Sequence, residues 1–111
     1  MADAVAAAAA IATIDVIQEE GLVQNADGMG KRLWDNLHSL KKDYPEMADV
    51  RGKGLMVALE LVSDRAKKTP AAKETLAKVF ETAYQAGAMV RISGPNLILS
   101  PPLVITGEDV Q

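Results

Sequence analysis

The sequence predicts a single α+β domain in which helices pack on one face of a small, mainly antiparallel three-stranded sheet. Two long N-terminal segments carry apolar side chains at spacings of three and four, the period of a helix. From residue 50 the apolar residues alternate with others, the period of a strand, and a third helical pattern precedes two short apolar runs. A chain of 111 residues is long enough for one domain with a small core, spanning residues 1–111.

The first segment is expected to be an alanine-rich helix that ends near Glu20. Alanine, the best helix former, fills positions 2, 4 and 6 to 10. Its small side chains favour close packing against a larger body, so we expect the helix to be buried. Asp3 and Asp15 bracket an apolar run that lacks a basic flank and is too short to span a bilayer, which argues against a targeting or membrane segment. Gly21 is expected to break or kink the helix.

A second helix is predicted from about Leu22 to Lys42. Lys41 and Lys42 suit the negative end of its dipole, and Pro45 prevents its continuation. One face carries the apolar residues Leu22, Ala26, Met29, Leu33, Leu37 and Leu40.

The segment GLMVALELV, residues 54–62, predicts a strand. The polar stretch from Ser63 to Pro70 is expected to be a loop. Pro70 then opens a third helix, for which Gly87 is the stop signal. The buried stripe of that helix is expected to be Leu76, Val79, Phe80 and Ala83.

Two short strands, residues 88–92 and 97–100, are expected to pair as a hairpin through the turn-rich link between them. The proline pair that follows cannot donate ladder hydrogen bonds and should end the second strand. Within the first strand Val90 and Ile92 should face the core, so Arg91 faces the opposite side. There the guanidinium could bind a carboxylate through two parallel hydrogen bonds, or it could be a solvated edge arginine or an internal partner of Glu60.

The C-terminus has the T-x-x-D spacing of a helix N-cap at Thr106 and Asp109. Only two residues follow, too few for a stable helix. Either the segment is an acidic tail that resembles a cap, or the sequence is a piece of a longer protein, truncated at both ends. We expect the second alternative.

Composition excludes several functional classes. A net charge of −3 provides no basic field for nucleic acid, and the absence of cysteine excludes disulfides and thiolate metal sites while fitting a reducing cytoplasm. The single histidine, His38, is interpreted as a helix-surface residue, and we expect no metal site. The glycines of Arg51-Gly52-Lys53-Gly54 are followed by a strand pattern rather than a helix, which argues against a phosphate cradle.

The motifs DVRGKGLM and VRISG followed by LSPPLVIT resemble the C-terminal small domain of class III aminotransferases, in particular the omega-amino-acid:pyruvate branch. The resemblance runs from about Ala4 to Asp109. It implies the small domain of a fold type I enzyme that uses pyridoxal 5'-phosphate. The cofactor lysine of such enzymes lies in a large domain that this chain lacks. The resemblance therefore implies no catalytic residue here and no activity for the chain alone.

The resemblance also implies roles for the chain within a complete enzyme. Arg91 would bind the carboxylate of small amino and 2-oxo acid substrates and swing aside for donors without one. A homodimer would follow. The cytoplasmic location is expected from the absence of cysteine, and no membrane partner is expected because the N-terminal apolar run is too short to span a bilayer. Pro95 stands after Gly94, where the family often has an acid, which leaves the role of Asn96 open. The alternative is a non-catalytic α+β binding or interaction module derived from such a domain.

Overall fold

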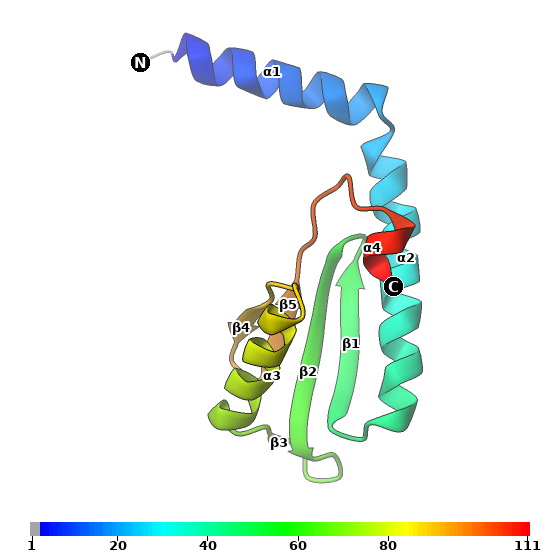
Figure 1. The fold of residues 1–111 in the computed structure, drawn as a ribbon, viewed down its shortest axis with the longest axis vertical. Helices are drawn as coiled ribbons and strands as arrows, with labels where there is room; N and C mark the ends of the chain where they lie inside the picture. The colour runs from blue at the N-terminus through cyan, green and yellow to red at the C-terminus, as the bar shows by residue number, and fades with distance from the viewer. Residues whose placement is uncertain (1–2) are drawn as a thin grey trace.

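The computed structural model describes residues 3–111, and it confirms an α+β fold with the helices on one side of an antiparallel sheet (Figure 1). The elements follow in the order α1 (Ala4–Glu19), α2 (Leu22–Asp43), β1 (Met47–Lys53), β2 (Met56–Asp64), β3 (Thr69–Pro70), α3 (Lys73–Gln85), β4 (Arg91–Ser93), β5 (Asn96–Leu99) and α4 (Gly107–Val110). None of the helices within the described range is long and apolar enough to cross a membrane.

The sheet has five strands rather than the three predicted. Its order is β1-β2-β5-β4, with β3 paired to β2, and every pairing is antiparallel. Strand β1 escaped prediction because only Met47 and Val50 are buried in it, and a register shift between Met47 and Asp49 interrupts the alternation. Strand β3 lies where we expected a loop. Pro70 pairs there with Val62, so the third helix begins later than predicted, at Lys73.

The N-terminal helix is confirmed, but its predicted burial is wrong. Helix α1 has no buried residue and projects away from the rest of the molecule (Figure 1). Alanine composition predicts a helix but says nothing of what covers it, and none of the described residues 3–111 buries a side chain of this helix. The helix is capped by Asp3, whose carboxylate accepts hydrogen bonds from the backbone N–H groups of Val5 and Ala6 at 3.1 Å. Gly21 separates α1 from α2 in a left-handed conformation (φ 61°), as the predicted break requires.

The core lies between the sheet and the two helices α2 and α3. Leu33 and Leu37 of α2 pack against it, and Leu76 is the only buried residue of α3. The other predicted stripe residues of α3 are less covered: Phe80 and Ala83 are half-buried and Val79 is exposed. The buried cluster consists of Met47, Val50, Val57, Leu59, Leu61, Leu76 and Leu97.

The C-terminal segment is held along α2 by side-chain amides. The Asn25 amide donates to the carbonyl oxygens of Leu103 (2.6 Å) and Ile105 (3.1 Å), and the Asn36 amide donates to that of Val110 (3.3 Å). Both amides are polar groups on a helix and gave no sequence signal of this role. The chain from 103 to 110 is therefore fixed by contacts about 75 to 80 residues distant in sequence.

The short helix α4 forms, contrary to the expectation that so few residues could not be helical. Both the backbone N–H and the hydroxyl of Thr106 donate to the Asp109 carboxylate, at 3.2 and 2.8 Å. A helix of four residues gains little stability from its own hydrogen bonds. The capping box between Thr106 and Asp109 and the burial of Val110 stabilise it instead.

We expect this capped turn to loosen in acid. The hydrogen bonds from Thr106 hold the pKa of Asp109 below its ordinary value. The cap therefore stabilises the fold fully above the unfolded-state pKa of about 4 and loses that contribution as the pH falls through the lower folded-state value. NMR titration of the side-chain carboxyl carbon should find Asp109 titrating below the ordinary aspartate value of about 4. Asp109→Asn should abolish the acid-induced change at the Thr106 amide, whereas Glu108→Gln should keep it. An Asp109 that titrates at the ordinary aspartate value would contradict the cap.

Candidate functional site

The sheet face opposite α2 and α3, called here the open face, carries a group of charged and polar side chains from four strands. Paired residues of an antiparallel sheet point to the same side. Leu59 pairs with Leu97, which pairs with Ile92, and this row belongs to the core side. The neighbouring rows belong to the open face: Arg51, Ala58, Ile98 and Arg91 in one, and Asp49, Glu60, Asn96 and Ser93 in the other.

Arg91 stands on β4, the edge strand of the sheet, and its side chain is exposed. Val90 packs against the core cluster and Ile92 shares the row of Leu97, so Arg91 lies on the open face as the alternation predicts. Within residues 3–111 the Arg91 guanidinium has no hydrogen bond or ion pair. The carboxylate of Glu60, its possible internal partner, binds another arginine. Arg91 is thus available to an anion from outside the chain.

That other arginine is Arg51, on β1. Its guanidinium contacts the carboxylates of Asp49 (3.2 Å) and Glu60 (3.4 Å) and donates to the side-chain oxygen of Asn96 at 2.9 Å. The three partners belong to β1, β2 and β5, so one side chain links three strands. Sequence reasoning missed this arrangement, although the charged residues that alternate with apolar ones on β1 and β2 were a signal.

The β4–β5 connection is a tight turn that carries one member of this cluster. Ser93 pairs directly with Asn96, and Gly94 adopts a left-handed conformation (φ 57°). The carbonyl oxygen of Pro95 accepts a hydrogen bond from the N–H of Leu61 at 3.0 Å. The role left open for Asn96 is therefore that of a hydrogen-bond acceptor for Arg51.

The glycine-rich stretch that resembles a phosphate turn forms the β1–β2 hairpin. Gly52 has no room for a Cβ atom because the Met56 carbonyl lies against it. Gly54 takes a left-handed conformation (φ 57°) in the turn, where it packs directly on Gly30 of α2. The glycines serve close backbone packing, as their strand context indicated.

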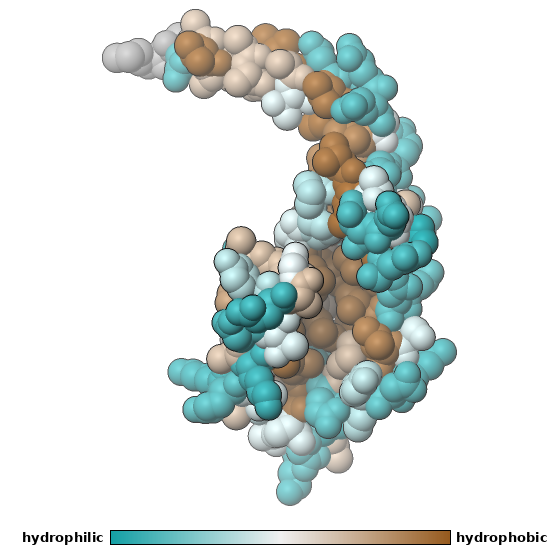
Figure 2. Space-filling view, in the orientation of Figure 1, coloured by the Kyte–Doolittle hydropathy of each residue, from teal (hydrophilic) through white to brown (hydrophobic). Residues whose placement is uncertain are grey.

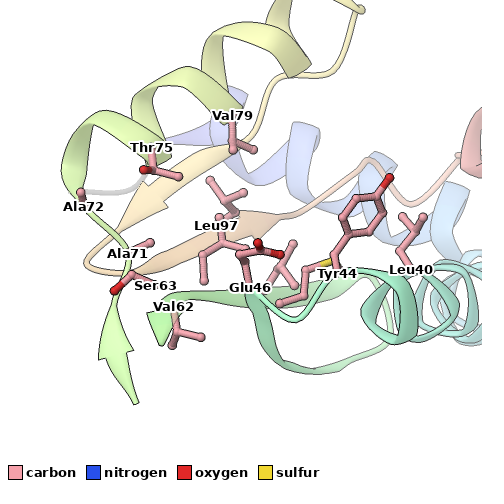
Figure 3. A pocket seen from close by; sticks show the side chains of 13 residues that line it. Leu40, Tyr44, Glu46, Val62, Ser63, Ala71, Ala72, Thr75, Val79 and Leu97 are labelled. Carbon is pink, nitrogen blue, oxygen red and sulfur yellow. The ribbon is translucent and has the colours of Figure 1, made fainter. Parts of the chain in front are cut away.

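The helix-covered side of the sheet has an apolar groove between the C-terminal end of α2 and α3. A cavity of about 590 Å³ lies there, with Leu59, Leu61 and Leu97 among the sheet residues that line it. Figure 3 shows Tyr44 and Leu40 on one side and Thr75 and Val79 on the other. The apolar floor is visible between the two helices in Figure 2. A second cavity, of about 540 Å³, lies between Leu33 and residues 87–90, 99–102, 104–105 and 109–110.

His38 differs from its prediction as a surface residue. It is half-buried, its ring centroid lies 3.7 Å from that of Trp34, and its Nε2 atom is buried without a hydrogen-bond partner in the described part of the chain. Trp34 and His38 are four residues apart on α2, a spacing that places their rings on the same side of the helix. Trp34 itself is exposed, so the ring pair lies at the surface of α2 with His38 on its more covered side. Among residues 3–111 no group of three or more His, Cys, Asp or Glu side chains could hold a metal ion.

The residues present do not fit pyridoxal phosphate. Seven of the eight lysines are exposed and Lys41 is half-buried on α2. Lys31 and Lys67 form surface pairs with Asp27 and Asp64. Within the described range no lysine lies in a cavity beside an anion cradle, and the glycine-rich stretch forms a hairpin. A cofactor of this kind requires residues beyond this chain.

Comparison with known proteins identifies the family. The model of the family "Aminotransferase class-III" matches residues 1–111. A taurine–pyruvate aminotransferase of Bilophila wadsworthia (strain 3_1_6) is 38% identical over 110 residues, which are 93% of this chain and 24% of that protein. A leucine/methionine racemase of Thermococcus litoralis is 40% identical over 105 residues, 94% of this chain and 24% of that protein.

Solved structures agree with the sequence comparison. An amine transaminase from an uncultivated Pseudomonas species, in its PLP-bound internal aldimine form, superimposes with a TM-score of 0.87 and 39% identity over 93% of this chain and 24% of that one. The chain thus spans about a quarter of the length of the proteins it resembles. Class III aminotransferases use pyridoxal phosphate in the complete enzyme. The chain belongs to the class-III aminotransferase family.

Proposed function

We propose that this chain is the substrate-selecting small domain of a pyridoxal-phosphate-dependent transaminase. The whole enzyme would transfer an amino group from an amine or omega-amino acid to pyruvate or another 2-oxo acid. The observation that carries the proposal is the guanidinium of Arg91, which has no partner among residues 3–111 and stands on the open face of a domain of this family. A planar fork of N–H donors matches the two oxygens of a carboxylate.

The similar proteins are compatible with an anion-binding role. Taurine and pyruvate, which the name of one relative contains, each carry an anionic group at neutral pH: taurine is a zwitterion with a sulfonate, and pyruvate is an anion with a carboxylate. A guanidinium can bind either group. That another relative is a racemase means that family membership alone does not specify transamination, so the assignment depends on a functional test.

The surfaces left uncovered in this chain fit a part of a larger assembly. Helix α1 exposes Val5, Ile11 and Ile14, and the groove between α2 and α3 is apolar. We propose that a large cofactor-binding domain and a second subunit of a homodimer cover apolar surface of this kind. A reducing compartment such as the cytoplasm suits a chain without cysteine.

The test is Arg91→Ala in the polypeptide that carries this domain together with a cofactor domain. Charge-assisted hydrogen bonds contribute about 1.5–3 kcal/mol, so KM for a carboxylate-bearing substrate should rise about tenfold to a hundredfold. The KM for a plain amine donor should stay unchanged, because that donor offers no anion. Steady-state kinetics with one substrate of each class measures the difference.

Arg65→Ala is the matched control. Arg65 follows the end of β2 and donates to the Met47 carbonyl at 3.0 Å, so its removal deletes the same charge at another place. It should leave the ratio of the two KM values unchanged. An equal effect of Arg91→Ala on both substrate classes would refute the carboxylate role. A complete polypeptide without aminotransferase activity would favour the non-catalytic module.

A further inference from the structure

The two arginines of the open face differ in their surroundings. Arg51 and Arg91 belong to the same cross-strand row, separated by Ala58 and Ile98. Arg51 is engaged by two carboxylates and one amide oxygen, and its side chain is 49% exposed. Arg91 has none of these contacts among the described residues. One arginine is thus neutralised and the other is free on a continuous surface.

Glu60 is the acid of this face that stands nearer to Arg91. It lies on β2, two strands from β4, whereas Asp49 lies on β1, three strands away. Glu60 pairs with Asn96, and Asn96 pairs with Ser93, two residues after Arg91. Glu60 and Arg91 are separated by two strand spacings of about 4.8 Å across the sheet and by two residues of about 3.4 Å along it. Their Cα atoms are therefore about 12 Å apart. An extended arginine and an extended glutamate can approach one another across that separation.

The Glu60 carboxylate is instead held by Arg51, which reaches across from β1 and contacts it at 3.4 Å. The same guanidinium is fixed by Asp49 of β1 at 3.2 Å and by the side-chain oxygen of Asn96 of β5 at 2.9 Å. A carboxylate in contact with this fixed guanidinium is drawn away from Arg91. The three-strand cluster therefore engages the open-face acid that stands nearer to Arg91.

We propose that Arg51 is a positioning residue for substrate selection: it holds Glu60 and so keeps Arg91 free for the carboxylate of the substrate. This inference rests on the proposed function of Arg91. The cluster lets a binding arginine and a nearby acid coexist on one exposed sheet face. Without Arg51, Glu60 would compete with the substrate for the Arg91 guanidinium.

The test is Arg51→Gln in the complete enzyme, with and without Glu60→Gln. In Arg51→Gln the released Glu60 would form an exposed ion pair with Arg91, and such pairs contribute at most about 1 kcal/mol. The substrate must displace this pair, so KM for a carboxylate-bearing substrate should rise about two- to fivefold. The KM for a plain amine should not change. Arg51→Gln/Glu60→Gln should restore the lower KM, because the competing carboxylate is gone. Lys67→Gln, which removes an exposed partner of Asp64, is the charge control and should leave both values unchanged.

The outcomes separate this inference from the function on which it rests. An unchanged carboxylate KM in Arg51→Gln would overturn it. A raised KM that Glu60→Gln fails to restore would also overturn it, since the loss would then come from the structural link between strands. If Arg91→Ala is selective while either of these results holds, only the role of Arg51 is wrong. If Arg91→Ala is not selective, both proposals are refuted.

Discussion

Replacement of Gly30 by alanine should lower the free energy of unfolding by about 2 kcal/mol or more, because the new methyl group has no space. Gly30 is buried on the side of α2 that meets the β1–β2 hairpin. A Cβ atom there would overlap the carbonyl group and the Cα atom of Gly54, which are backbone atoms that cannot rotate away. The helix or the hairpin would have to shift, and both are tied to the core.

Gly28 is the matched control on the same helix. It is exposed, and a Cβ atom there would meet nothing within 4 Å. Gly28→Ala should therefore stabilise the protein by up to about 1 kcal/mol, since alanine forms helices better than glycine. Urea denaturation followed by circular dichroism measures both variants. Equal changes in the two would mean that the contact between Gly30 and Gly54 does not limit the packing of α2.

Replacement of Leu76 by alanine should cost about 2–4 kcal/mol and release α3 from the sheet. Leu76 is 3% exposed and is the only buried residue of the helix, so it supplies the anchor of α3 in the core. The lost contacts are with the cluster that includes Leu59 and Leu97. Thermal unfolding measures the cost, and α3 amide signals should lose dispersion in NMR spectra before those of β2.

Val79→Ala distinguishes anchoring from general helix stability. Val79 lies on the same helix but is 37% exposed, so its truncation should cost about 1 kcal/mol or less. If this variant and Leu76→Ala destabilise the protein equally, the groove side of α3 contributes as much as the core side. The burial pattern would then not describe how α3 is held.

The long periodic elements could be predicted from the sequence, for physical reasons. In α2 and β2 many residues repeat the same spacing, so each apolar face is specified several times. Strand β1 has few apolar residues and an interrupted register, and β3 has only two residues. Helix α4 depends on a single reciprocal cap, which the T-x-x-D spacing indicated but chain length argued against.

The site was predictable only in its local part. The side of the sheet on which Arg91 lies follows from its two neighbours, Val90 and Ile92, because successive strand residues face opposite sides. The structure has the arginine on the side that this alternation predicts. The partners of Arg51 depend on the sheet order, which places β5 beside β2 and so brings Asn96 next to Glu60. No local pattern contains that order. The same limit explains why Asn25 gave no sign of its bond to a carbonyl 78 residues away.

The exposed helix α1 has a consequence for how the molecule fluctuates. Its 16 residues have no buried side chain, and Gly21 separates them from the packed part of the chain. Isolated helices shorter than about 12–15 residues are marginal in water, and α1 with 16 residues is only slightly longer. We therefore expect helix α1 to melt and reform independently of the core, as a unit of low local stability, and the amides of β2 to become accessible to solvent only when the whole fold opens. A surface that docks on α1 would change this, because it would convert a fluctuating segment into one that shares the cooperativity of the core.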